Sequence, residues 1–153
     1  MTRPYVPPRG RVLTPYICCR EATKAIGWYG EVFGARLTWD PFLDPDGRVG
    51  HAEIEIDGAV IMLSDADPDA GIAAPGAVAT YSLNLYVPDV DATVAAAERA
   101  GATVVTPVAE QFYGSRTGTI VDPFGIRWLL ATHVREVSET ELAAVMKEYG
   151  EPG

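Results

Sequence analysis

The chain carries the same succession of sequence patterns twice, and this duplication limits its fold more than any other feature. Each half shows one strand-like run, then apolar residues at helical spacing, then three more strand-like runs. The two copies lie about 65 residues apart, which is longer than the repeats of solenoid proteins. The sequence therefore predicts an α+β fold made of two βαβββ modules rather than an array of short repeats.

The first module is expected over residues 12–64. Apolar side chains recur at helical spacing over 22–33, and Gly34 is placed to end that helix. The pair Asp57-Gly58 is a strong signal for a tight hairpin between the last two strands. The strands expected in this module are 12–19, 37–42, 51–56 and 59–63.

The second module is expected over residues 79–132 and repeats this order. An alanine-rich helix is expected over 90–100, with Asp89 as its N-cap. The sequence DPFG, residues 122–125, indicates the turn of a hairpin. The strands expected in this module are 80–87, 103–108, 117–121 and 126–131.

Three further segments complete the chain. Residues 1–11 are expected to form an N-terminal extension, and residues 65–78, rich in Asp, Ala, Gly and Pro, the linker between the modules. Residues 133–153 form a C-terminal segment. Within it, Ser138 and Glu141 have the spacing of a capping box, which predicts a short helix after Ser138.

Charge and cysteine content limit the partners and the compartment. A net charge of -9 argues against nucleic acid, because phosphates reward basic surfaces. The same charge could attract a cationic ligand, although solubility is the simpler explanation. No apolar run approaches the roughly 20 residues that cross a bilayer, and the adjacent Cys18 and Cys19 are too close for an ordinary disulfide. We therefore expect a cytoplasmic protein with no nucleic-acid partner and no membrane contact.

Four segments together resemble the vicinal oxygen chelate superfamily of glyoxalases, bleomycin-resistance proteins and extradiol dioxygenases, and most closely its PhnB-like branch. They are LTPYICCREATKAIGWY (13–29), GHAEIEIDGAVIMLSD (50–65), LNLYVPDVDA (83–92) and QFYGSRTGTIVDPFGIRWLLATHVREVS (111–138). The resemblance implies that each module forms a curved mixed sheet, that paired modules enclose a cavity for a small molecule, and that the protein is a homodimer. Whether the modules pair within one chain or across the dimer stays open.

The resemblance also implies where a metal ion would be held. Metal-dependent members use His, Gln and Glu side chains at four strand positions, and here those positions fall at Thr14, Met62, Ser82 and Leu129. These four side chains do not form a ligand set for a divalent ion. We therefore expect no metal site and no cofactor.

The strand 51–56 carries the candidate catalytic residues. Its apolar residues alternate with His51, Glu53 and Glu55, so that the polar set should face the concave side of the sheet. A histidine beside a carboxylate can act as a general acid and base, which makes His51 and Glu53 the candidates. The alternative is that the polar residues only mark the solvated face of an edge strand.

Further residues are candidates for contacting a ligand, because they are aromatic or polar residues in a loop or stand at inward-facing strand positions. For Phe112 and Tyr113, packing in the core between the modules is an equal alternative. These candidates are Trp39, Met62, Asn84, Tyr86, Phe112, Tyr113, Arg116 and Arg127.

Three functions fit these patterns. The first is a metal-free protein of the bleomycin-resistance kind that binds a small molecule in a dimeric cavity. The second is a glyoxalase-type lyase or isomerase in which His51 and Glu53 act as acid and base. The third is a structural or regulatory dimer without a ligand, so the sequence leaves open whether the chain is an enzyme.

Overall fold

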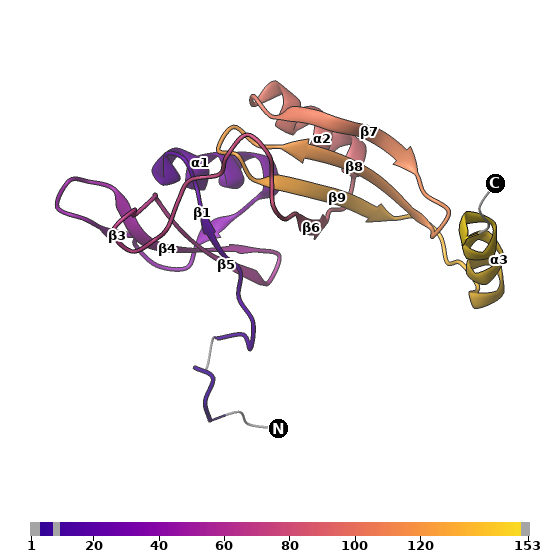
Figure 1. Cartoon of the computed structure of the whole chain (residues 1–153), viewed down its shortest axis with the longest axis horizontal. Coiled ribbons are helices and arrows are strands. Elements are labelled where there is room, and N and C mark those ends of the chain that lie inside the picture. The colour runs from indigo at the N-terminus through magenta and orange to yellow at the C-terminus, as the bar shows by residue number, and fades with distance from the viewer. Residues whose placement is uncertain (1–3, 8–9, 151–153) are drawn as a thin grey trace. The chain divides into compact units, whose positions relative to one another are not determined.

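The computed structural model describes residues 4–7 and 10–150, and the chain forms two compact units. Unit 1 holds the chain up to Ala79 together with Pro123–Ile126, and unit 2 holds Thr80–Asp122 and the chain from Arg127 onward. Parts of the expected terminal segments, residues 1–3, 8–9 and 151–153, lie outside the described residues. Figure 1 shows that each unit combines strands with helices.

Unit 1 contains one helix and a mixed sheet. Strand β1 runs parallel to β5, whereas β4 is antiparallel to β2, β3 and β5, and the strands follow the order β1-β5-β4-β2 with β3 also paired to β4. Its elements are β1 (Tyr16–Cys18), α1 (Ala22–Phe33), β2 (Arg36–Leu37), β3 (Phe42–Leu43), β4 (Val49–Ile56) and β5 (Ala59–Ser64).

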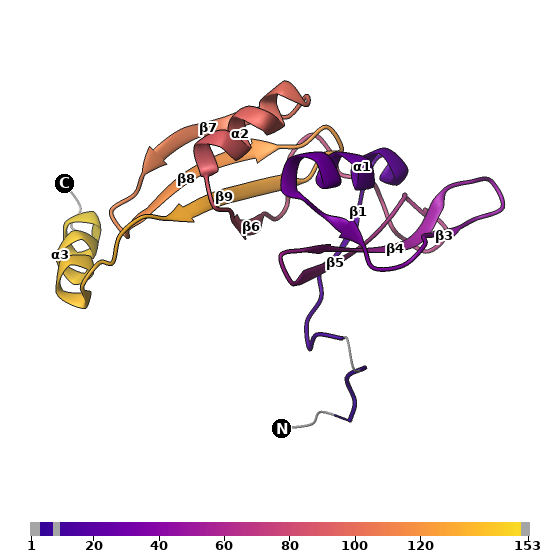
Figure 2. The ribbon, with the colours of Figure 1, turned by 180° about the vertical axis from the view of Figure 1, so that it is seen from behind.

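Unit 2 repeats the plan with a sheet in the order β6-β9-β8-β7, in which β6 is parallel to β9 and the other pairs are antiparallel. Figure 2 shows α2 lying across the strands of this sheet. Its elements are β6 (Leu83–Tyr86), α2 (Val90–Arg99), β7 (Thr103–Glu110), β8 (Ser115–Val121), β9 (Arg127–His133) and α3 (Glu139–Gly150). The predicted α+β fold with two curved mixed sheets is confirmed.

The strand boundaries depart from the sequence-based expectation where prolines intervene. The run expected over 12–19 forms a strand only at Tyr16–Cys18, directly after Pro15. The prediction of a single strand over 37–42 was wrong. The chain forms two short strands there, β2 and β3, with a bend between them. Pro41 in that interval has no N–H to give to a ladder, which explains the interruption.

Local capping signals were predicted correctly. Gly34 ends α1 in the left-handed region at φ 68°. The Asp89 carboxylate accepts the backbone N–H of Ala92 at the start of α2, at 2.9 Å. In front of α3, the Ser138 N–H donates to the Glu141 carboxylate at 2.9 Å, and the Ser138 hydroxyl accepts the Glu141 N–H at 3.2 Å, which completes the capping box.

The core of each unit lies between its helix and one face of its sheet. In unit 1, Trp28 and Tyr29 of α1 are 7% and 0% exposed, and both rings lie against Phe124 with centroids 6.3 and 6.2 Å away. In unit 2, Trp128 is 1% exposed and its indole N–H donates to the Asp122 carboxylate at 2.8 Å. Because the helices cover one face, the other face of each sheet is left for function.

Within the described residues, the structure contains no helix that is both long and apolar enough to cross a membrane.

Candidate functional site

Strand β4 divides its side chains between the two faces of the unit 1 sheet. Ala52, Ile54 and Ile56 are at most 4% exposed and pack under α1. The alternating partners His51, Glu53 and Glu55 are only half-buried and lie on the opposite, helix-free face. The candidate acid and base therefore occupy the same face of one strand.

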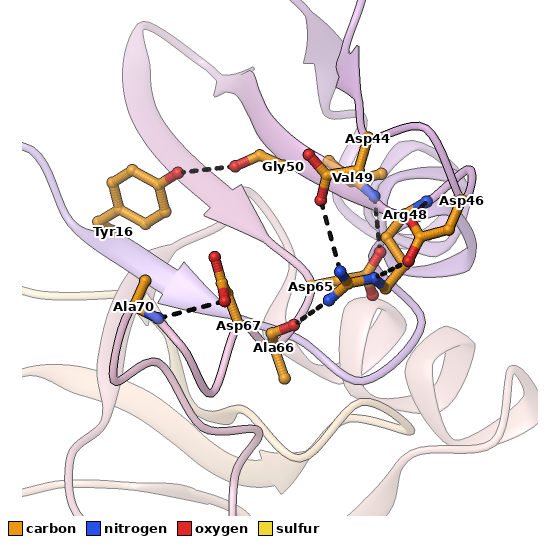
Figure 3. Close-up of polar contacts among 10 residues, drawn as sticks. All are labelled: Tyr16, Asp44, Asp46, Arg48, Val49, Gly50, Asp65, Ala66, Asp67 and Ala70. Atoms are coloured by element: carbon orange, nitrogen blue, oxygen red, sulfur yellow. Dashed lines mark hydrogen bonds and ion pairs between the residues drawn. The ribbon is translucent and has the colours of Figure 1, made fainter.

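A third residue joins them from the neighbouring strand β1. The Tyr16 hydroxyl lies 3.0 Å from Nδ1 of His51, and Nε2 of the same imidazole lies 3.7 Å from Oε1 of Glu53. Tyr16, His51 and Glu53 form a continuous polar row, which we call the Tyr16 cluster. The Tyr16 hydroxyl also lies 3.3 Å from the backbone oxygen of Gly50, as Figure 3 shows.

The strand register explains how the Tyr16 cluster assembles. Met62 on β5 stands opposite Tyr16 of β1 on one side and opposite Glu53 of β4 on the other. Residues at paired register positions point to the same face. Met62 therefore sits between the phenol and the carboxylate, and the tyrosine reaches across β5 to the imidazole.

The Tyr16 cluster can bind polar groups and move a proton. When the tyrosine donates to Nδ1, the neutral imidazole carries its proton on Nε2 and points it toward Glu53. In the other neutral tautomer, Nδ1 donates to the tyrosine oxygen and Nε2 is an acceptor, to which the Glu53 carboxylate has no proton to give. The His51 and Glu53 side chains are 34% and 14% exposed. The imidazole is therefore accessible to a ligand, while the carboxylate is mostly withdrawn from water.

Unit 2 presents a second set of candidates on the face away from α2. Asn84 and Tyr86 of β6 are exposed, and Asn84 stands opposite Leu129 of β9. The Arg127 guanidinium donates to the Ser82 hydroxyl, which fixes the arginine at the start of β9. These residues are brought together on one sheet face, as the strand alternation predicted.

Arg116 lies on the other face. Its guanidinium forms a bidentate ion pair with the Asp91 carboxylate of α2, donating two hydrogen bonds of 2.9 and 2.8 Å. Hydrogen bonds from Arg116 lower the pKa of Asp91, and the same pairing raises the pKa of Arg116. The structure therefore gives Arg116 a partner within its own unit.

The aromatic candidates lie in irregular segments. Phe112 and Tyr113 form an edge-to-face pair with centroids 5.2 Å apart in the turn before β8, where Phe112 is half-buried and Tyr113 is exposed. Trp39 lies in the bend after β2 and is 52% exposed. It follows Thr38, whose N–H donates to the backbone oxygen of Glu53 at 3.0 Å, so the backbone of this bend is held beside β4.

Comparison with known families decides the affiliation of this fold. Residues 11–130 match the Glyoxalase/Bleomycin resistance protein/Dioxygenase superfamily. The chain belongs to this superfamily. An uncharacterized protein of Mycobacterium bovis is 36% identical over 144 residues, which cover 91% of this chain and 94% of the relative.

Solved structures share the superfamily fold. TioX from Micromonospora sp. ML1 has a TM-score of 0.64 at 23% identity, covering 82% of this chain and 100% of its own. A gene product from Arabidopsis thaliana reaches 0.65 at 26% identity, covering 79% and 98%. The PhnB protein from Bacillus cereus reaches 0.61 at 17% identity, covering 80% and 99%. The predicted superfamily is confirmed, and a PhnB protein stands among the structures with this fold.

At the positions where the resemblance places the superfamily's metal ligands, the side chains do not suit a metal ion. Thr14 and Met62 occupy them in unit 1, and Ser82 and Leu129 occupy them in unit 2. A thioether and an alkyl group offer no hard donor for a divalent cation, and the Ser82 hydroxyl is engaged by Arg127. Across the described part of the chain, no group of three or more His, Cys, Asp or Glu residues is placed to hold a metal. The residues present do not fit the superfamily's ion.

Two functional contacts were missed by sequence reasoning. Tyr16 was not among the sequence-based candidates, and its contact with His51 depends on the β1–β5 register, which no local pattern reveals. Asp65 was assigned to the linker, although its carboxylate accepts the N–H groups of Ala22 and Val49, each at 2.8 Å. The missing signal for Asp65 was that Glu21, in front of α1, provides no side-chain cap.

Arg48 holds the turn between β3 and β4 in place. Figure 3 shows its guanidinium between the Asp46 carboxylate at 2.6 Å, the Ala66 oxygen at 2.8 Å and the Asp44 carboxylate at 3.9 Å. Hydrogen bonding from Arg48 lowers the pKa of Asp46. One arginine here faces two carboxylates, those of Asp44 and Asp46, so the turn before β4 keeps a net negative charge.

Cys18 shares the helix-free face with Tyr16, but it is not an activated nucleophile. Burial raises the pKa of the Cys18 thiol, and the negative charge of Asp65 raises it further. We expect iodoacetamide at pH 8 to alkylate Cys18 more slowly than an unstructured peptide thiol, because less thiolate is present. Mass spectrometry of the timed reaction measures this rate, and Cys18→Ala assigns the modified site. A rate above that of the peptide would contradict the expectation.

Proposed function

We propose that this superfamily member binds a small molecule, without the superfamily's metal ion, on the helix-free face of the unit 1 sheet. The observation that carries the proposal is the Tyr16 cluster. It places a phenol, an imidazole and a carboxylate in one row around Met62, the position of a metal ligand in metal-dependent relatives. Polar groups that converge around an apolar side chain such as Met62 are typical of ligand sites.

In this proposal the further candidates widen the binding surface. Trp39 and Met62 extend it in unit 1. Asn84, Tyr86 and Arg127 are proposed as a second ligand-contacting surface that belongs to unit 2 by itself. The aromatic pair Phe112 and Tyr113 is proposed as a further ligand contact within unit 2, where Arg116 is paired with Asp91.

The proposal includes a cytoplasmic homodimer whose sheets enclose the ligand, with no nucleic acid and no membrane as partner. Strands β1 and β6 each stand at an edge of their sheet, and edge strands are available for pairing. Free thiols at Cys18 and Cys19 suit a reducing compartment. The net charge of -9 disfavours binding to phosphates. Sedimentation equilibrium tests the dimer directly, and a monomer at tens of micromolar would contradict it.

Fluorescence titration tests the binding proposal. Basic glycopeptide and aromatic antibiotics are added to the protein while emission from Trp39 is followed, since Trp28 and Trp128 are buried in the cores. We expect a saturable change that Trp39→Phe removes. His51→Ala should raise the Kd about tenfold, the effect of losing one well-placed polar contact. A panel of such compounds that gives no saturable response at millimolar concentration would count against the proposal.

A second function is favoured by one feature of the same cluster. The row from Tyr16 through His51 to Glu53 places an imidazole between a weak acid and a carboxylate, an arrangement that general acid and base catalysis can use. It supports a glyoxalase-type lyase or isomerase. An assay with methylglyoxal and glutathione tests it. If an activity is found and both His51→Ala and Glu53→Gln leave it unchanged, the assigned roles are wrong.

A further inference from the structure

Two carboxylates on the same strand and the same face have different surroundings. Glu55 forms an ion pair with Arg36, whose guanidinium donates to the carboxylate at 2.7 Å. This hydrogen bond lowers the pKa of Glu55. Glu53 stands two residues earlier and is more deeply placed, with 14% of its side chain exposed against 27% for Glu55. The more buried of the two carboxylates is therefore the one whose neighbour is an imidazole rather than an arginine.

The Glu53 carboxylate has fewer hydrogen-bond donors around it than its two oxygens can accept. Its two oxygens offer about four acceptor sites. Within the described part of the chain, its one polar side-chain contact is Nε2 of His51 at 3.7 Å, which is too long for a hydrogen bond. A carboxylate that has lost most of its water without gaining donors is costly, so such groups usually have a partner.

A second polar atom on this face lacks a partner. Ser64 follows Met62 by two residues on β5 and stands opposite Cys18 of β1, which places it on the same face as the Tyr16 cluster. Ser64 is 3% exposed, and within the described residues its hydroxyl has no hydrogen-bond partner. One buried hydroxyl without a partner and one carboxylate short of protein donors lie on the same face, which indicates that this face can take up an additional molecule.

The groups that surround Glu53 select for a cation with an apolar body. The Tyr16 and His51 rings have centroids 5.5 Å apart at an angle of 52°, and Met62 stands between Tyr16 and Glu53. An aromatic face attracts a cation, and a thioether packs well against hydrocarbon. An anionic ligand would be repelled by Glu53 and by the overall charge of -9.

We infer that Glu53 is the counter-ion for a protonated amine of the ligand, whose hydrocarbon part packs on Tyr16 and Met62. This inference rests on the proposed binding function and names the chemical class of its ligand. The ammonium group supplies the donors that the Glu53 oxygens lack, and one charge-assisted hydrogen bond replaces the long contact to His51.

The probes 2-phenylethylamine and 2-phenylethanol differ in the charged group and test the inference at neutral pH. Binding is measured by protein NMR titration for the wild type, Glu53→Gln and Glu55→Gln. We expect the wild type to bind the amine more tightly than the alcohol. Glu53→Gln should weaken amine binding about tenfold and leave alcohol binding within about twofold. Glu55→Gln, the matched control on the same strand face, should leave the affinity for the amine within about twofold.

Thermal unfolding shows whether Glu53→Gln acts through folding. We expect its Tm to be no lower than that of the wild type, because the amide removes an unpaired charge and adds a donor. If the alcohol binds at this face as tightly as the amine, or if Glu53→Gln leaves amine binding unchanged, the inference fails while the proposed binding function stands. If neither probe shifts the Tyr16 and His51 resonances, the inference is contradicted, and the antibiotic titration then judges the binding function separately.

Discussion

Replacing Asp65 with alanine is expected to lower the free energy of unfolding by about 2–4 kcal/mol, from the loss of two hydrogen bonds to a charged acceptor. One carboxylate oxygen accepts the N–H of Ala22, and the other accepts the N–H of Val49, both at 2.8 Å. The Asp65 N–H also donates to the Val49 oxygen at 2.8 Å. Ala22 opens α1 and Val49 opens β4, so one side chain joins the helix to the sheet.

Urea denaturation followed by circular dichroism measures this loss. Asp65→Asn should fall between the wild type and Asp65→Ala, because the amide keeps one acceptor oxygen without the charge. Asp67→Ala is the matched control, since among the described residues that exposed carboxylate accepts just the nearby Ala70 N–H at 3.2 Å. We expect Asp67→Ala to change stability by less than about 1 kcal/mol, as for exposed surface positions. Equal losses for Asp65→Ala and Asp67→Ala would refute the bridging role of Asp65.

The same substitution should disturb the candidate site. His51 follows Val49 by two residues, and the Tyr16 hydroxyl reaches both His51 and the Gly50 oxygen. When the first residue of β4 loses its anchor, this end of the strand is less firmly held against β5. We therefore expect Asp65→Ala to broaden or shift the His51 imidazole resonances in NMR spectra under conditions in which the variant stays folded.

Most of the fold could be predicted because its determinants are local in the sequence. Helical periodicity gave α1 and α2, the Asp57-Gly58 pair gave the β4–β5 hairpin, and both central residues of that turn have positive φ, at 44° and 83°. Single-residue signals also sufficed for the helix ends, as the Asp89 cap shows. Short strands were harder, because Pro41 interrupts a run whose composition still favours extended structure.

The site could be predicted only in part, because its contacts are long-range. Alternation on β4 placed His51 and Glu53 together from sequence alone. Tyr16 lies 35 residues before His51, and only the parallel pairing of β1 with β5 brings the phenol to the imidazole. Asp65 was hidden by composition, since an aspartate beside alanine, proline and glycine resembles a linker residue until its two N–H partners are known.

The QFYG sequence in front of β8 is explained by the surroundings of its glycine. Gly114 adopts φ +86°, a region that glycine enters without steric cost. A Cβ added there would lie 2.2 Å from the Arg135 oxygen and 2.9 Å from a Val137 methyl carbon. The Gly114 oxygen also accepts the N–H groups of Val134 and Arg135, at 2.9 and 3.1 Å. The turn and the segment that leads into α3 are therefore in direct backbone contact.

Gly114→Ala is accordingly expected to destabilise unit 2 by about 3 kcal/mol, which combines the cost of positive φ for alanine with that of overpacking. Gly76→Ala is the matched control, because its added Cβ meets nothing within 4 Å and its φ is not positive. Both substitutions reduce the entropy of the unfolded chain equally, so their difference isolates the native-state strain. Urea denaturation measures both, and hydrogen exchange at Val134 and Arg135 should accelerate only in Gly114→Ala. Losses that agree within about 1 kcal/mol would show that the turn shifts freely and that the QFYG glycine is not required by this contact.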